Sequence, residues 1–153
     1  MRLLVSIVLL AVSCAPSSSP TPGPAQTYPM YQYVVQVPTK PLSPNERLKL
    51  AWEPRLASGT SSSIYELQLC VALFGPWESV DALKKAMATR DTRSCPPLGE
   101  TVASVTERVA SNTGARMDTE VMVPSAPGFY DLRQISIFSA GNSTSAGSVI
   151  EVR

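Results

Sequence analysis

The sequence contains no histidine. Histidine is the usual general base near neutral pH and the commonest metal ligand in proteins. Its absence excludes Ser-His-Asp and Cys-His catalysis, together with the zinc motifs that need an imidazole ligand. The chain also lacks a glycine-rich phosphate-binding loop and a dinucleotide fingerprint. We therefore predict a protein that is not an enzyme and has no catalytic residues, cofactor or metal.

Charged residues are scarce as well, at 16% of the 153 residues, with 13 basic against 12 acidic side chains. A neutral surface gives no support for binding nucleic acid through a basic patch, so no nucleic-acid partner is expected. Hydrophobic residues reach 44%, which indicates an ordered globular protein. The length is sufficient for one domain with a sizeable core.

The apolar run near the N-terminus is too short to span a bilayer, which needs about 20 residues. It occupies residues 3–12 and follows Arg2, a pattern typical of a signal peptide. The run leads into Leu10-Ala11-Val12-Ser13-Cys14. This segment resembles the bacterial lipobox, although Ala11 stands where leucine is usual.

The lipobox resemblance implies that residues 1–13 are removed and that Cys14 is lipidated. The protein would then be extracytoplasmic and anchored to the bacterial membrane through its N-terminal lipid. Ala15 follows the cysteine where an aspartate would resemble an inner-membrane retention signal, so the outer membrane is favoured if the cell has one. The alternative is an ordinary secretory signal, with Cys14 removed or left as a free thiol.

Residues 14–30 are predicted to form a tether. They contain five prolines and three consecutive serines and offer little apolar surface to bury. The folded domain is accordingly expected at residues 31–153.

The strongest strand pattern in this domain lies at residues 64–74. Its odd positions are apolar or aromatic, whereas its even positions mix polar and small residues. That alternation predicts a central strand with one face in the core and the other partly covered.

Further strands are predicted at 31–37, 46–52, 100–110, 116–123, 129–138 and 147–152. Helix remains the alternative for residues 100–110. Pro54 is expected to stop the second strand, with exposed loops at 57–63 and 139–145, and Trp52 is expected in the core. Residues 80–88 are predicted to be a short helix, because Ser79 can cap it and Asp81 lies in its first turn.

Seven short strands with frequent turns indicate an antiparallel β-sandwich. The stretch Pro127-Gly128-Phe129-Tyr130-Asp131-Leu132-Arg133 resembles the entry to the penultimate strand of bacterial immunoglobulin-like and fibronectin-type modules. Residues 43–52 are similar to their second strand. The resemblance implies an all-β, immunoglobulin-like sandwich of about seven strands with one short helical insertion. It implies no activity.

Cys70 and Cys95 are the two cysteines of the predicted domain. An even count in an oxidising compartment predicts a disulfide between them. A redox-active pair is the alternative, but the C-x-x-C spacing that would support it is missing.

Two groups of residues are candidates for function. Phe74 and Trp77 flank a Gly-Pro turn and could stack on a sugar ring or enter a partner's pocket. The interpretation that we favour is that Trp77 instead holds the helix against the sheet. Asp118, Glu120 and Asp131 could serve acid–base chemistry or a calcium ion, although carboxylates on strands are usually just solvated.

The sequence thus predicts a lipid-anchored binding or structural module of the cell envelope. Its expected partners are the membrane, through the lipid, and envelope proteins or glycans. A carbohydrate-binding module that uses the loop from Phe74 to Trp77 is the first alternative, and it requires Trp77 to be exposed. A small envelope enzyme is the second: it requires Asp118, Glu120 or Asp131 to converge in a pocket, and a cleft that holds two of them would support it.

Overall fold

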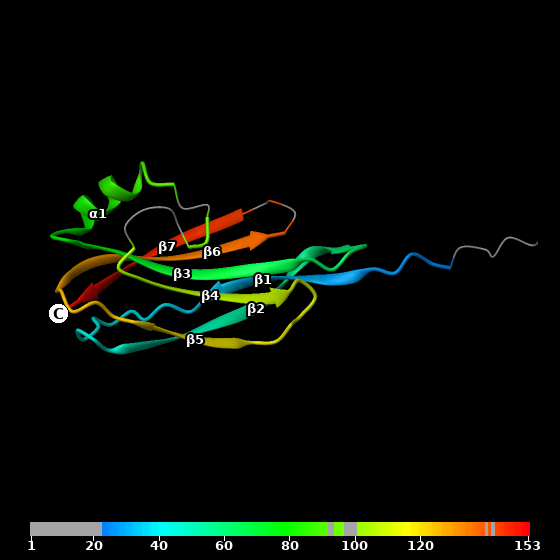
Figure 1. Cartoon of the computed structure of the whole chain (residues 1–153), viewed down its shortest axis with the longest axis horizontal. Coiled ribbons are helices and arrows are strands. Elements are labelled where there is room, and N and C mark those ends of the chain that lie inside the picture. Colours follow the sequence, from blue (N-terminus) through cyan, green and yellow to red (C-terminus); the bar gives the residue numbers. More distant parts are fainter. Residues whose placement is uncertain (1–22, 92–93, 97–100, 140, 142) are drawn as a thin grey trace, which may run out of the picture.

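The computed structural model describes residues 23–91, 94–96, 101–139, 141 and 143–153, so Cys14 and the predicted signal peptide lie outside the described residues. The elements, in chain order, are β1 (Tyr28–Val35), β2 (Arg47–Ser61), β3 (Glu66–Trp77), α1 (Val80–Met87), β4 (Ala103–Ala110), β5 (Met117–Met122), β6 (Gly128–Phe138) and β7 (Ser143–Val152). The strands form two antiparallel sheets that face each other, with orders β1-β2-β5 and β4-β3-β6-β7 (Figure 1). The prediction of an antiparallel β-sandwich of about seven strands with one helical insertion is confirmed.

The connectivity follows the immunoglobulin-like pattern with one change. In constant-type immunoglobulin domains the fourth strand joins the sheet of the first, second and fifth strands. Here β4 instead pairs with β3, which enlarges the opposite sheet to four strands. The Tyr130 hydroxyl donates to the carbonyl of Ala126 at 2.7 Å, which is the tyrosine corner of this fold. Burial of the Tyr130 ring raises the pKa of its phenol above the usual value.

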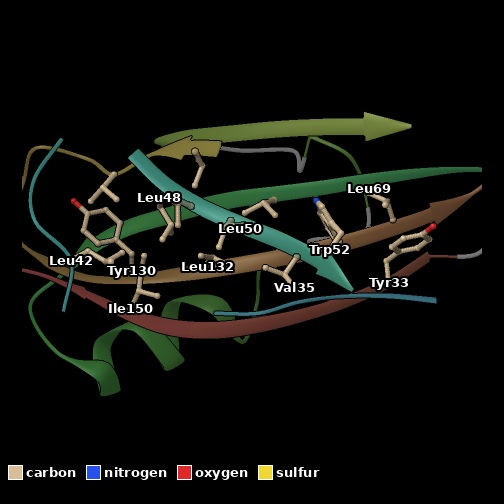
Figure 2. Close-up of a cluster of buried hydrophobic side chains, with 14 of the residues drawn as sticks. Tyr33, Val35, Leu42, Leu48, Leu50, Trp52, Leu69, Tyr130, Leu132 and Ile150 are labelled. Atoms are coloured by element: carbon tan, nitrogen blue, oxygen red, sulfur yellow. The ribbon is translucent and has the colours of Figure 1, made fainter. Parts of the chain in front are cut away.

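The main core lies between the two sheets. Leu48, Leu50 and Trp52 of β2 alternate toward it, and so do the apolar odd positions of β3, as their spacing predicts. Figure 2 shows the Trp52 and Leu69 side chains between the strands. Trp52 is fully buried, so its predicted place in the core is confirmed.

A second layer covers the outer face of β3, which the sequence predicted to be only partly covered. Cys70, Ala72 and Phe74 alternate with the core positions of β3, yet all three are fully buried. Helix α1 packs on β3 and β6 and buries Leu83, while the Ser79 hydroxyl caps the helix by accepting from the Ala82 amide at 3.2 Å. The strand β3 is therefore enclosed on both faces.

A disulfide between Cys70 and Cys95 attaches the connection that follows α1 to the middle of β3. The Thr106 hydroxyl of β4 lies 3.3 Å from the sulfur of Cys70, and the Gln68 amide donates to the carbonyl of Cys95 at 3.3 Å. The helical insertion is thus held to the sheet at a covalent bond as well as by packing.

Three predicted boundaries are wrong. β2 continues through Pro54 to Ser61, although residues 57–63 were expected to be a loop. Pro54 lies beyond the last pair of the β2–β5 ladder, so its missing N–H removes no bond of that ladder. β1 begins at Tyr28, inside the predicted tether, and β7 begins at Ser143, inside the predicted hairpin loop. Residues 103–110 form a strand, so the helical alternative there is excluded.

Candidate binding surface

Two of the three candidate carboxylates, Asp118 and Glu120, line one cleft, as the enzyme alternative requires, whereas Asp131 lies apart from them on β6. Asp131 is 3% exposed on β6, and its carboxylate accepts from the Arg133 guanidinium at 2.8 Å. Asp118 and Glu120 lie on β5 in the other sheet, with their side chains 74% and 46% exposed. The arrangement separates one buried, ion-paired carboxylate from two that face solvent.

Asp118 and Glu120 line an open cleft of about 600 Å³ between the edges of β4 and β5. Each is already paired with cations: Arg116 lies 3.2 Å from Asp118, and Lys49 lies 3.7 Å from Glu120. A third acid in the cleft, Glu107, has the Thr119 hydroxyl 3.5 Å from its carboxylate. Among the residues that the structure describes, no group of three or more histidine, cysteine or acidic side chains could hold a metal ion.

Phe74 does not contribute to a binding surface. The structure buries it completely beneath the helical insertion, and the Arg90 guanidinium lies 4.8 Å from the centre of its ring. The prediction that Phe74 could contact a ligand is therefore wrong. The reason is that the insertion covers the outer face of β3, which the alternation of this strand alone does not indicate.

Trp77 is half-buried, and its neighbour in the sheet is Phe129. An irregularity in the β3–β6 ladder between Phe74 and Trp77 places these two aromatic residues opposite each other. Gly75 and Gly128 make this junction possible. A Cβ atom on Gly75 would lie 2.7 Å from the Tyr130 ring, and one on Gly128 would lie 2.9 Å from Pro76.

Phe129 also lines a cleft of about 530 Å³. The other side of this cleft is formed by residues 37–41, which cross from β1 toward β7. Lys40 brings a positive charge, Glu151 is paired with Arg153 at 2.8 Å, and Val149 is 42% exposed. The cleft therefore combines apolar surface with both signs of charge. We call Trp77, Phe129, Lys40, Val149 and Glu151 the distal surface.

The distal surface lies far from the point at which the chain enters the domain. Figure 1 shows residues 23–27 running into β1 at one end of the sandwich, and α1 and the C-terminus at the opposite end. Trp77 ends β3, shortly before α1 begins at Val80, and Glu151 is near the C-terminus. Sequence reasoning found Trp77 but missed Phe129 and Lys40. The motif Pro127-Gly128-Phe129-Tyr130 could have indicated that Phe129 is on the outer face. Neighbouring residues of a strand point to opposite faces, so a residue next to the buried tyrosine must point outward.

Tyr33 is the other buried phenol of the domain, at the end where the chain enters. It donates a hydrogen bond to the carbonyl of Thr113, and burial, with a smaller effect of Tyr31, raises the pKa of Tyr33. These contacts fix β1 to the connection between β4 and β5.

No helix among the described residues is long and apolar enough to cross a membrane. No protein-family model matches the chain, and the searches of curated proteins and of solved structures found no match either.

Proposed function

We propose that this protein is a non-catalytic, extracytoplasmic binding or structural module of the bacterial cell envelope, anchored by a lipid on Cys14. The observation that carries the proposal is that the chain entry and the distal surface lie at opposite ends of the domain. A module held at its entry end would direct this surface away from the membrane.

The length of the tether supports this arrangement. Residues 15–27 separate Cys14 from β1 and include four prolines. Extended at about 3.1 Å per residue, they give a reach of up to about 40 Å. If the cell has an outer membrane, the residue after Cys14 favours that location. Envelope proteins or glycans would then be the partners.

The assignment as a non-enzyme is supported by the state of the carboxylates. Asp131 is buried against Arg133, whereas Asp118 and Glu120 face solvent beside cations. General acid–base catalysis needs a carboxyl within hydrogen-bond reach of a substrate. Asp131 is too deeply buried for such a contact, and in the cleft shared by Asp118 and Glu120 the neighbouring cations compete for both carboxylates.

A glycan is the second candidate partner of the distal surface, and Trp77 carries this alternative. Aromatic rings stack on the apolar faces of sugars, and Trp77 and Phe129 lie side by side at an accessible end of the sheet. The half-burial of Trp77 leaves part of its ring for such a contact.

The distal surface can be tested with a photo-crosslinking amino acid at Trp77 in the producing cell. We expect crosslinked envelope products from position 77 and none from the matched position Met122, which is 49% exposed on β5. Equal labelling at both positions, or labelling at Met122 alone, would contradict the proposal. For the glycan alternative, N-acetylglucosamine oligomers are expected to change the tryptophan emission of the wild type but not of Trp77→Phe, because Trp52 is fully buried.

A further inference from the structure

The strands β1 and β2 continue past β5 at the end where the chain enters, and the Tyr31 amide, which donates to the carbonyl of Ser111 at 2.9 Å, bonds β1 to the connection after β4. β2 pairs with β5 only up to Trp52, and beyond it residues 53–56 and 60–61 pair with β1, with an irregularity of the ladder between them. Tyr28 pairs with Ser61, and Tyr31 pairs with Leu56. We call residues 28–31 and 56–61 the overhanging ribbon. Figure 1 shows it beside residues 23–27.

The overhanging ribbon exposes an apolar side chain on the side of the sheet that faces the core elsewhere along β2. Leu56 follows the core positions Leu50 and Trp52 at even spacing along β2, so its side chain is on the core face of the sheet. Leu56 is nevertheless 68% exposed, more than any other large hydrophobic residue that the structure describes. Ile64, just past the end of β2, is 47% exposed. Single exposed apolar residues are ordinary, but these two lie at the end that a lipid anchor would hold.

The overhanging ribbon itself carries no charge, although Arg55 precedes Leu56 and the exposed ion pair of Glu66 and Arg108 lies beside Ile64. No charged residue occurs between Leu3 and Thr39, and none occurs between Leu56 and Tyr65. Elsewhere the exposed strands are charged, as in Arg47 and Lys49 of β2 and Glu120 of β5. An uncharged ribbon can enter the interfacial region of a bilayer without losing the hydration of an ion. Its tyrosines suit that region, because their rings are apolar and their hydroxyls are polar.

We propose that the overhanging ribbon and Ile64 rest on the lipid surface to which the protein is anchored. This inference rests on the proposed lipidation of Cys14. Leu56 and Ile64 enter the interface, and Tyr28 and Tyr31 lie at the level of the headgroups. Contact at this end orients the sandwich upright and presents the distal surface to the envelope.

The anchor makes such a small contact effective. Two apolar side chains alone give weak binding to a bilayer, but a tethered contact forms within one molecule and benefits from a high effective concentration. The occupant that we assign is the lipid surface, because residues 15–27 connect the ribbon directly to Cys14. A second copy of the chain is the competing occupant, and the experiment below distinguishes the two.

The experiment uses the full lipidated chain in phosphatidylcholine vesicles, with and without phospholipids brominated on their acyl chains. Leu56→Trp is introduced into a Trp77→Phe background, so that the buried Trp52 is the one native tryptophan left beside the new reporter. We expect brominated lipid to remove most of the emission added at position 56. Val149→Trp in the same background is the matched control, since Val149 is 42% exposed on β7 near the distal surface, and its emission should not change. Ile64→Trp provides a second reporter in case the first variant fails to fold.

The results distinguish a failure of the proposed anchoring from a failure of the proposed lipid contact. If mass spectrometry finds no acyl group on Cys14, the proposed anchoring is wrong, and the inference falls with it. If Cys14 is acylated but neither reporter is quenched, the ribbon does not contact lipid, while the proposed function stands. Equal quenching at positions 56 and 149 also overturns the inference, because the domain then has no fixed orientation. If the emission at position 56 is not quenched but shifts with the number of protein molecules per vesicle, the ribbon contacts a second copy of the chain instead of lipid.

Discussion

Replacing Gly75 with alanine is expected to lower the free energy of unfolding by about 4 kcal/mol, through backbone strain and overpacking together. Gly75 has a φ angle of +137°, in a region that favours glycine. An added Cβ would also lie 2.7 Å from the Tyr130 ring and 2.9 Å from the carbonyl oxygen of Phe129. Since Tyr130 is fully buried and held by its hydroxyl, its ring has no room to move aside.

Gly59 provides a matched control for this substitution. Its φ angle is +126°, but a Cβ added there would have no atom within 4 Å. Gly59→Ala should therefore show the backbone strain alone, about 1–2 kcal/mol. Urea denaturation of both variants, followed by circular dichroism, measures the difference. Equal losses would mean that the close packing of Gly75 against the tyrosine corner contributes nothing to stability.

Removing the disulfide is expected to lower the free energy of unfolding by about 3.5 kcal/mol, according to the chain-entropy model for a separation of 25 residues. The variant carries Cys70→Ala and Cys95→Ala together, which avoids leaving a free thiol. The physical reason is that the bond restricts the unfolded chain across α1 and the connection after it. Urea denaturation of the variant and of the wild type, each with and without reductant, measures the loss.

The position of the bond also predicts where stability is lost first. Hydrogen exchange should become faster in α1, which packs on the outer face of β3, and much less in the strands that enclose Trp52. Reductant should destabilise the wild type and leave the variant unchanged. If the variant is as stable as the oxidised wild type, or if exchange rises evenly over the domain, the insertion is not held by this bond.

Alternation along the chain was sufficient to predict the sandwich and most of its strands. Period-two patterns select one face of a strand, and in β2 and β3 that face is the core. The outer layer could not be predicted in the same way. The even positions of β3 carry glutamine, cysteine and alanine beside Phe74, a mixture that fits a half-exposed face as well as one covered by a helix. Whether α1 covers that face depends on contacts between segments distant in the sequence.

The candidate surface was predicted only in part for a related reason. Trp77 stood out because it follows Gly75 and Pro76 at the end of a strong strand. The position of Phe129 opposite Trp77 depends on the irregular register between β3 and β6. The spacing of hydrophobic residues along the chain does not determine the register of an irregular ladder. The overhanging ribbon was missed because prolines at positions 29 and 54 suggested tether and loop. Both positions are tolerated in strands that have no partner on one side.

The proposed lipidation of Cys14 would place the domain on a membrane and give its two ends different roles. The most direct test is the intact mass of the mature protein from the membrane fraction of the producing cell, together with the mass of its N-terminal peptide. We expect a mature chain that begins at Cys14 and carries acyl chains, and we expect the Cys14→Ser variant to be absent from the membrane fraction. A mature chain that begins elsewhere, or an unmodified Cys14 on a protein that still fractionates with the membrane, would contradict the proposed lipidation.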